Sequence, residues 1–430
     1  MGKSYSNWKE YSFKDFCDIT SSKRIFYREY VKSGIPFYRS KEIIAKSNGK
    51  ELNDCLYISK DRFEEIKNKY GIPINGDILI TAVGTYGIPY LINEDGDFYF
   101  KDGNLIWLKN IKDVADSNFL FYWFKSEEAK NKVEGIIIGS VQKALTIDAM
   151  KNIKINLPPL AEQKRIASIL SALDDKIELN NKTNKILEEM AQTIFKEWFI
   201  NFNFPNEDGK PYKKSGGEMI DSELGKIPKG WKVDIISNFF NVTIGKTPPR
   251  KEIECFSKNC KNTKWVSISD MGNSGLFIVD TSEYLTSEAI KKYNVNIVPQ
   301  NTVILSFKLT IGRVSITSED MTTNEAIAHF NSDNNFINEY LYFYLKNFNY
   351  RVLGNTSSIA EAINSKIIKS IKIIIPKENT LNKFHNAVFD MFNLIKNNQI
   401  ENEKLSNIRD SLLPKLMTPK GRRADGEIRV

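Results

Sequence analysis

The sequence has little of the residues that most catalytic and metal sites require. Its 430 residues include two histidines, His329 and His385, and four cysteines at irregular spacing. Two histidines leave little material for a metal cluster or a histidine general base. The cysteine spacing matches neither a disulfide framework nor a zinc site. We therefore expect no resident metal, and we expect a reducing, cytoplasmic environment.

Long apolar runs are also missing. No stretch approaches the roughly 20 residues that a membrane helix needs, and the first eight residues lack the apolar segment of a secretory signal. Lysine and arginine number 61 against 53 acidic residues, which gives a net charge of +8. This charge permits binding to nucleic acid but does not establish it.

Motifs for nucleotide or methyl-transfer chemistry are absent too. The run Asn156-Leu-Pro-Pro-Leu160 lacks the directly adjacent polar residue and aromatic residue that hold a flipped base in an adenine methyltransferase. Gly245-Lys-Thr247 ends like a phosphate-binding loop, but Phe240 stands where that loop requires glycine. The charged run containing Asp61, Glu64 and Glu65 predicts a solvated helix face. We expect a protein that is not an enzyme and that carries no cofactor.

What the sequence does contain is one long unit twice. Trp8-Lys9 recurs as Trp231-Lys232 at an offset of 223, and Ile78–Thr81 with the later Gly87 recurs as Val303–Ser306 with Gly312 at 225. Each β-branched run predicts a strand followed by a glycine-containing loop. Aromatic segments at 119–125 and 340–346 predict buried helices.

The clearest match aligns residues 140–158 with residues 358–376. Seven of the 19 positions are identical, where unrelated segments share about one or two, so the chain contains a duplication. Both copies end in a predicted strand, 153–157 and 371–375, which a proline closes.

A long helix with a coiled-coil seam is predicted after each of these prolines. Apolar residues, with two asparagines at the middle, recur at alternating spacings of four and three, and the second copy follows the first by 218 residues. The alternative is two separate amphipathic helices, each lying on its own domain. The predicted seam residues are Ile166, Leu170, Leu173, Ile177, Asn180, Asn184, Leu187 and Trp198 in the first helix, and Phe384, Met391, Ile395, Asn398, Asn402, Leu405, Leu412 and Leu416 in the second.

Asparagine in a seam fixes register and partner at a cost in stability. Antiparallel pairing places Asn180 against Asn402, Asn184 against Asn398, and Trp198 against Phe384. Parallel pairing also matches asparagine with asparagine, so this register alone does not decide between them. The segment from Phe204 to Gly230 favours the antiparallel form, since it delivers the second domain locally.

The resulting fold class is α+β, with two similar α/β domains separated by two long helices in a pseudo-twofold antiparallel coiled coil. We expect a first domain at 1–157, a spacer helix at 158–203, a linker at 204–228, a second domain at 229–375, a C-terminal helix at 376–418 and a tail at 419–430. The 32 steps from Ile166 to Trp198 span about 48 Å, against about 34 Å for a turn of B-DNA. Such a rod suits two DNA-reading heads.

Several segments resemble the specificity (S) subunit of Type I restriction-modification systems. The most specific is Leu157-Pro-Pro-Leu-Ala-Glu-Gln-Lys-Arg165. Weaker ones are 139–143, Pro205–Tyr212, 227–231 and 409–416, and together they cover essentially the whole chain in order. The second copy departs from the pattern, because 376–382 lacks the Pro-Pro-Leu and Glu-Gln-Lys elements.

The resemblance implies a non-catalytic subunit whose two target-recognition domains each read half of a split double-stranded DNA site. It also implies two methyltransferase (M) subunits docked on the helices, which act at adenine N6 with S-adenosylmethionine, and restriction (R) subunits that use ATP and Mg²⁺. A scaffold that binds only proteins, and a fused nuclease or methyltransferase, are the competing hypotheses.

Base reading needs hydrogen-bonding side chains on loops, and phosphate contacts need Lys, Arg, Ser or Thr. The duplication places such residues at corresponding points of both domains. The candidate DNA-binding residues are Arg39, Ser40, Lys41, Thr81, Thr85, Gln142 and Lys143 in the first domain, and Lys246, Thr247, Arg250, Lys308, Arg313, Ser357 and Ser358 in the second.

Overall fold

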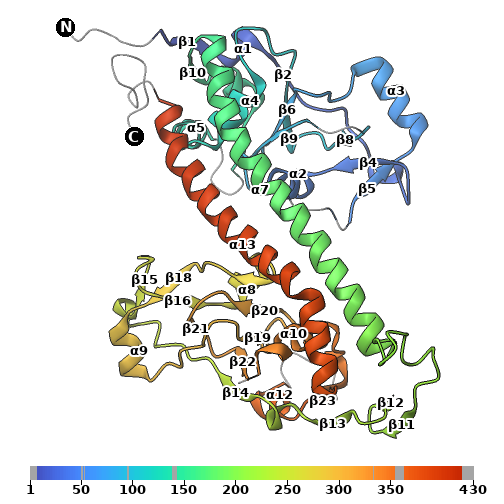
Figure 1. The fold of residues 1–430 in the computed structure, drawn as a ribbon. Helices are drawn as coiled ribbons and strands as arrows, with labels where there is room; N and C mark the ends of the chain where they lie inside the picture. Colours follow the sequence, from blue (N-terminus) through green and yellow to red (C-terminus); the bar gives the residue numbers. More distant parts are fainter. Residues whose placement is uncertain are drawn as a thin grey trace. The chain divides into compact units, whose positions relative to one another are not determined.

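The structure is a computed structural model that describes residues 7–49, 52, 54–93, 96–137, 143–332, 334–353 and 363–418. The chain divides into two compact units (Figure 1). Unit 1 is made of residues 1–178 and 405–430, and unit 2 is made of residues 179–404. Each unit holds one copy of the repeat and one portion of each long helix.

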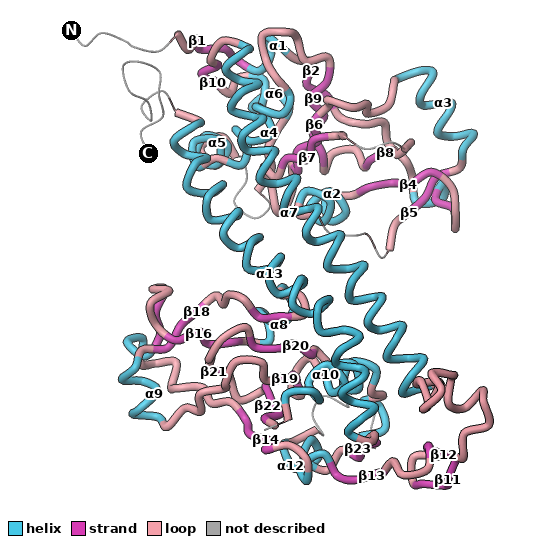
Figure 2. The backbone as a smooth tube through the Cα atoms, in the orientation of Figure 1, coloured by secondary structure: helices cyan, strands magenta, loops and turns pink. Residues whose placement is uncertain are grey.

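Unit 1 contains three small sheets, whose strands Figure 2 distinguishes from the helices. The central sheet is antiparallel, in the order β2 (Asp18–Thr20), β9 (Leu105–Lys109), β6 (Ile78–Thr81), β7 (Pro89–Leu91). The second sheet has the order β3 (Tyr30–Val31), β5 (Leu56–Ile58), β4 (Ile35–Tyr38), β8 (Tyr99–Phe100), and its β4–β8 pair is parallel. The third joins β1 (Lys9–Ser12) to β10 (Lys154–Leu157).

Short helices cover these sheets of unit 1. They are α1 (Phe13–Phe16), η1 (Tyr27–Glu29), α2 (Ser40–Ser47), α3 (Lys60–Tyr70), α4 (Ser117–Lys125), α5 (Glu127–Glu134) and α6 (Ile147–Lys151). Asp61, Glu64 and Glu65 lie exposed on α3, as the charge pattern predicts. The run Ile78–Thr81 has no exposed side chain, because β6 is an inner strand covered on both faces.

Unit 2 repeats this topology. Its central sheet has the order β14 (Asn241–Ile244), β22 (Ile327–Asn331), β19 (Val303–Ser306), β20 (Val314–Thr317), β17 (Phe277–Ile278). The second sheet has the order β15 (Phe256–Ser257), β18 (Glu283–Leu285), β16 (Thr263–Val266), β21 (Thr322–Thr323), and β13 (Lys232–Ile235) pairs with β23 (Lys372–Ile375). Strand order matches unit 1 strand for strand, with β17 added, and the β16–β21 pair is parallel like β4–β8. The duplication predicted from sequence is therefore a duplication of fold.

The remaining elements of unit 2 are short. A hairpin of β11 (Met219–Ser222) and β12 (Gly225–Pro228) precedes the repeat. The helices are η2 (Lys196–Ile200), η3 (Ile236–Asn238), η4 (Ile253–Cys255), α8 (Ile268–Asn273), α9 (Ser287–Tyr293), η5 (Asn335–Ile337), α10 (Asn338–Asn347), η6 (Tyr350–Leu353) and α12 (Ser365–Lys369). The π-helical turn η2 continues the first long helix.

The two aromatic segments form α4 and α10, and their large side chains lie in the cores. In unit 1, Asp116 caps α4 by accepting a hydrogen bond from Phe119 N at 2.9 Å. In unit 2, Phe195 and Phe199 from the first long helix pack on Tyr340 of α10 with ring centroids 5.8 and 4.7 Å apart. The prediction of buried helices is confirmed.

The two long helices are α7 (Leu160–Phe195) and α13 (Glu378–Leu416), shown in green and red in Figure 1. Pro158 and Pro159 end β10 and prevent helix before Leu160, because proline removes a backbone donor and restricts the residue before it. In unit 2, Asn180 Nδ2 donates to Asn402 Oδ1 at 2.9 Å and Asn398 Nδ2 donates to Asn184 Oδ1 at 2.8 Å. Residue numbers rise along one helix as they fall along the other, so the pairing is antiparallel.

Candidate nucleic-acid interface

The loop between β6 and β7 is held from inside by Thr81. Its hydroxyl accepts a hydrogen bond from Ile88 N at 3.0 Å, and its carbonyl accepts one from Gly87 N at 2.7 Å. Thr81 is fully buried, so it positions the loop and does not offer its hydroxyl to a ligand. Thr85, at the tip of the loop, is exposed.

Lys143 lies beside this loop. Leu145 N donates to Ala82 O at 2.8 Å, and Val83 and Ala144 form an isolated antiparallel bridge. The side chain of Lys143 is exposed, as is that of Thr85. The structure thus brings together two candidates that stand about 60 residues apart in sequence. Gln142 lies outside the described residues.

The same arrangement recurs between β19 and β20. Arg313 N donates to Ser306 Oγ at 3.1 Å, Gly312 N donates to Ser306 O at 3.0 Å, and Ser306 is fully buried. Lys308, in the loop, is exposed. The guanidinium of Arg313 turns inward and donates to Ile268 O, so this candidate ties the loop to α8. Ser357 and Ser358 lie outside the described residues.

Arg39, Ser40 and Lys41 lie at the start of helix α2, where Arg39 and Lys41 surround the buried carboxylate of Glu42. Glu42 accepts from Arg39 Nη2 at 2.6 Å and from Arg39 N at 2.8 Å, and Lys41 Nζ lies 3.4 Å away. Burial raises the pKa of Glu42, but the hydrogen bonds from Arg39 outweigh it, and its pKa lies below the ordinary value. Ser40 Oγ donates to Asn104 O at 3.3 Å. Lys41 is the exposed member of this group.

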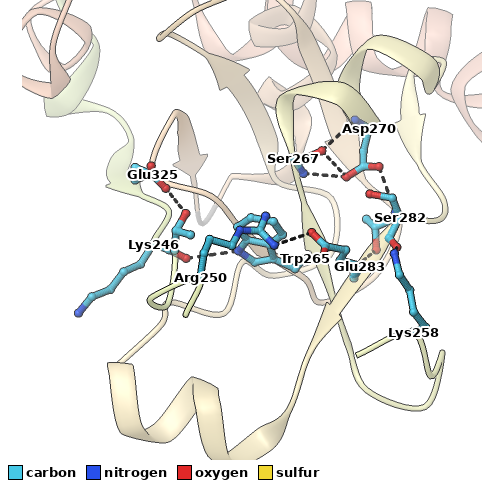
Figure 3. Close-up of polar contacts among 11 residues, drawn as sticks. Lys246, Arg250, Lys258, Trp265, Ser267, Asp270, Ser282, Glu283 and Glu325 are labelled. Atoms are coloured by element: carbon cyan, nitrogen blue, oxygen red, sulfur yellow. Dashed lines mark hydrogen bonds and ion pairs between the residues drawn. The ribbon is translucent and has the colours of Figure 1, made fainter. Parts of the chain in front are cut away.

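Unit 2 has a corresponding cap at the start of α8. Ser267 N donates to Asp270 Oδ2 at 2.8 Å, and Ser282 N donates to the other oxygen, Asp270 Oδ1, at 3.0 Å. Figure 3 shows Asp270 between these two backbone donors. The position of Arg39 in unit 1 is occupied by Ser267 in unit 2. The two repeats therefore share the carboxylate that caps the helix and differ in the residue at the helix start.

Arg250 lies on an aromatic platform in unit 2 (Figure 3). Its guanidinium carbon is 4.2 Å from the ring centroid of Phe256 and 4.6 Å from that of Trp265. Its Nη1 donates to Glu283 Oε2 at 2.9 Å. A planar guanidinium stacked in this way is held in one orientation, which is the geometry required for bidentate contacts with guanine or phosphate. Arg250 is exposed.

The segment before Arg250 crosses close to another strand. A Cβ atom added at Gly245 would lie 2.1 Å from Asn324 O, so only glycine fits where the two backbones meet. This contact accounts for the glycine of Gly245-Lys-Thr247 without a phosphate loop. The side chain of Lys246 is exposed, and Thr247 donates its hydroxyl to Glu325.

The predicted seam residues are all buried or partly buried. In unit 2, Asn180 and Asn398 are buried, Trp198 is 5.9 Å from Phe384 between ring centroids, Leu187 and Met391 pack against the core, and Ile395 is within it. In unit 1, Leu416 shares a core cluster with Ile166 and Leu170, and Leu412 packs against it. Leu173, Ile177, Asn184, Asn402 and Leu405 are partly buried.

Sequence reasoning missed some polar partners of this seam. Asn180 Nδ2 also donates to Glu401 Oε2, and Asn402 Nδ2 donates to Asn181 Oδ1, each at 2.8 Å. In unit 1, Arg409 Nη1 pairs with Asp174 Oδ1 at 2.7 Å. Arg409 also falls at a seam position of the second helix, seven residues after Asn402, and this charged residue in the apolar pattern was the available signal for an ion pair.

Both histidines are fixed by internal contacts. His329 is fully buried between the hydroxyls of Thr243 and Thr323, at 2.8 and 2.7 Å, and burial lowers its pKa to about 4. His385 Nδ1 lies 3.0 Å from Glu339 Oε1 beside a cavity of about 340 Å³. Within the described ranges, no group of three or more His, Cys, Asp or Glu residues is placed to hold a metal ion. The same ranges contain no helix long and apolar enough to span a membrane.

The chain thus has two copies of one α/β fold, each with a loop held by a buried hydroxyl, together with two long antiparallel helices. This combination is the one expected of a DNA-specificity protein. The family model for the Type I restriction modification DNA specificity domain matches residues 5–189 and 228–409, and the chain belongs to this family. It is a specificity subunit, the non-catalytic component of such a system, and specificity subunits carry no cofactor.

Individual relatives agree with this assignment. The chain is 30% identical to the Type I restriction enzyme MjaIX specificity subunit of Methanocaldococcus jannaschii, over 100% of this chain and 95% of that one. It is 25% identical to the HindI specificity subunit of Haemophilus influenzae, over 96% and 99%. Among solved structures, the S subunit from M. genitalium has the same fold, with a TM-score of 0.59, 15% identity and 96% coverage of each chain.

Proposed function

We propose that each repeat of this specificity subunit reads one half of a bipartite double-stranded DNA target. The observation that carries the proposal is that both repeats hold the corresponding loop by hydrogen bonds to one buried hydroxyl residue. Thr81 and Ser306 occupy equivalent places and fix equivalent loops, while the exposed residues on those loops differ. A common framework with different exposed side chains is what reading two different half-sites requires.

Within the first half-site interface we assign Lys41, Thr85, Gln142 and Lys143 to direct contact, and Arg39, Ser40 and Thr81 to positioning. Within the second we assign Lys246, Arg250, Lys308, Ser357 and Ser358 to contact, and Thr247 and Arg313 to positioning. For the described residues the division follows exposure, and the positioning residues also make internal hydrogen bonds. Lysines supply phosphate contacts, and stacked Arg250 supplies a planar, directional donor.

We further propose that two M subunits dock on α7 and α13, that R subunits join this complex, and that the assembly acts in the cytoplasm. Support comes from apolar side chains that the helices leave exposed. In unit 2 these include Leu179, Ile186 and Met190 on α7 and Leu394 on α13, and in unit 1 Ile408, with exposures between 45% and 59%. Methylation at adenine N6 with S-adenosylmethionine, and cleavage with ATP and Mg²⁺, then belong to those partners.

The test is to co-express the full chain with the M subunit encoded beside it and to sequence the methylated bases of the host genome. The expected result is methylation confined to one split motif with a fixed spacer. A chain in which residues 229–375 are replaced by those of a relative is expected to change one half of the motif and keep the other. Methylation without sequence preference, or a change in both halves, would contradict the proposal.

A further inference from the structure

Leu309 has a conformation and an exposure that leucine rarely combines. It lies in the β19–β20 loop with 83% of its surface exposed and a backbone φ of +60°. Thr310 N donates to Lys308 O at 2.7 Å, which closes a three-residue turn around it. A left-handed residue at the centre of such a turn is rare and strained for any side chain with a Cβ. An observed outlier of this kind is a reason to look for function.

The first repeat makes the same loop without this strain. At an offset of 225 residues Leu309 aligns with Gly84, whose φ is +77°. Two further left-handed positions align at the same offset: Gly76 with Asn301, and Gly87 with Gly312. Glycine and asparagine tolerate this conformation. Leucine is therefore the exception, and the turn itself does not require it.

The surroundings of Leu309 fix it in this exposed position. Ser306 Oγ donates to Thr310 O at 2.6 Å and accepts from Arg313 N at 3.1 Å, so both arms of the loop are tied to one buried hydroxyl. Lys308 and Thr310, on either side, are exposed. A loop whose backbone is already fixed loses little entropy when it binds a partner. A flanking cation favours a partner that carries phosphate.

From this strain, exposure and position we propose that Leu309 is a specificity-determining residue that contacts the 5-methyl group of a thymine in the second half-site. Apolar contact with that methyl is the way an aliphatic side chain reads a base pair in the major groove. The inference rests on the proposed function. It adds that one position of the target is read without a hydrogen bond.

The experiment uses the full chain assembled with its M subunit and a duplex carrying its methylated motif. Each thymine of the second half-site, on either strand, is replaced in turn by deoxyuridine, which removes only the methyl group. Wild type is expected to lose about 10-fold in affinity at one position, the scale of one buried methyl group. Leu309→Gly is expected to bind thymine and deoxyuridine equally at that position.

Leu309→Gly is expected to fold normally, because Gly84 already makes this turn in the first repeat. Its unfolding temperature is expected to equal or exceed that of wild type. Leu224→Ala, at another exposed leucine in unit 2, is the control and is expected to keep the deoxyuridine penalty. A half-site without thymine, a wild type indifferent to deoxyuridine, or a penalty that survives in Leu309→Gly would each overturn the inference. Methylation without any motif would instead overturn the proposed function.

Discussion

Asn398 donates its side-chain amide to the side-chain oxygen Oδ1 of Asn184 across the paired helices of unit 2, at 2.8 Å. One turn away, Asn180 and Asn402 form the equivalent pair at 2.9 Å. These two amide pairs therefore form only when the helices hold this register. A shift by one heptad would place most of these amides opposite apolar side chains, which costs the desolvation of polar groups without hydrogen bonds.

Replacing both members of one pair, Asn184→Leu with Asn398→Leu, is expected to stabilise the helices and loosen their register. The thermal midpoint is expected to rise, by roughly 2–4 °C for each kcal/mol gained. Methylation is expected to spread to targets with spacers about three base pairs longer or shorter, because one heptad of helix spans about 10.5 Å and a base pair about 3.4 Å. Calorimetry and methylation of a spacer series measure the two effects. A less stable variant with an unchanged spacer would contradict the role given to these asparagines.

His329 predicts a pH dependence of stability. Its pKa of about 4 in the fold lies below the ordinary value of 6.5, so the unfolded chain binds a proton that the folded chain does not. Stability is complete above about pH 6.5, falls as the pH drops towards 4, and levels off below that. The loss amounts to about 3 kcal/mol, at roughly 1.4 kcal/mol per pH unit. Denaturant unfolding of wild type and His329→Gln measures it, and an equally steep decline in both would contradict this assignment.

Gly245 predicts a steric requirement. Gly245→Ala places a Cβ 2.1 Å from the backbone oxygen of Asn324, which must move, so we expect a loss of about 2–3 kcal/mol in unfolding free energy. Gly135→Ala is the control, since its nearest contact would be 3.4 Å away and its φ of −68° is helical. Equal stability of the two variants in urea would show that the crossing at Gly245 is not tight.

Arg250 predicts a base- or phosphate-contact that lysine cannot replace. Arg250→Ala is expected to weaken binding of the assembled complex to its motif by about 1–3 kcal/mol. Arg250→Lys is expected to recover little of this loss, because an ammonium group cannot stack on the aromatic rings or donate two parallel hydrogen bonds. Fluorescence anisotropy with labelled duplex measures affinity at two salt concentrations. Near-wild-type binding by the lysine variant would show that only charge matters at this position.

Removing the side chain of Asp174 is expected to lower the stability of unit 1. It accepts from Tyr122 at 2.9 Å and Arg409 at 2.7 Å, and Lys125, whose pKa burial lowers, lies 3.7 Å away. Asp174→Ala removes this shared acceptor and leaves Arg409 with Asp410, 2.9 Å from its Nε, as an acceptor. We expect a loss of about 2 kcal/mol after allowing for partial exposure. Lys130→Ala, which removes an exposed pair with Glu127, is expected to change stability by less than about 0.5 kcal/mol. Equal effects would contradict the network.

The sequence predicted those features of the fold that depend on periodicity and self-similarity. Strand Ile78–Thr81 could be predicted because four buried positions need four apolar or β-branched residues. Asn180 and Asn402 could be predicted as partners because they are polar residues at seam positions that are otherwise apolar. Contacts between distant segments were not accessible in this way. Nothing in the order of residues shows that Arg250 stacks on Trp265 or that Thr81 points inward, because each depends on strands meeting in space.

Unit 1 is assembled from residues 1–178 and 405–430, with Leu416 and Met417 buried among Ile166 and Leu170. During synthesis, the apolar face of the first part of α7 therefore leaves the ribosome long before the end of α13, which covers it, has been translated. The second repeat must fold while that face is still uncovered. A nascent chain stalled before Leu405 would be a natural substrate for chaperones. A truncation there would leave the apolar face of α7 exposed even though the sheets of both units are complete.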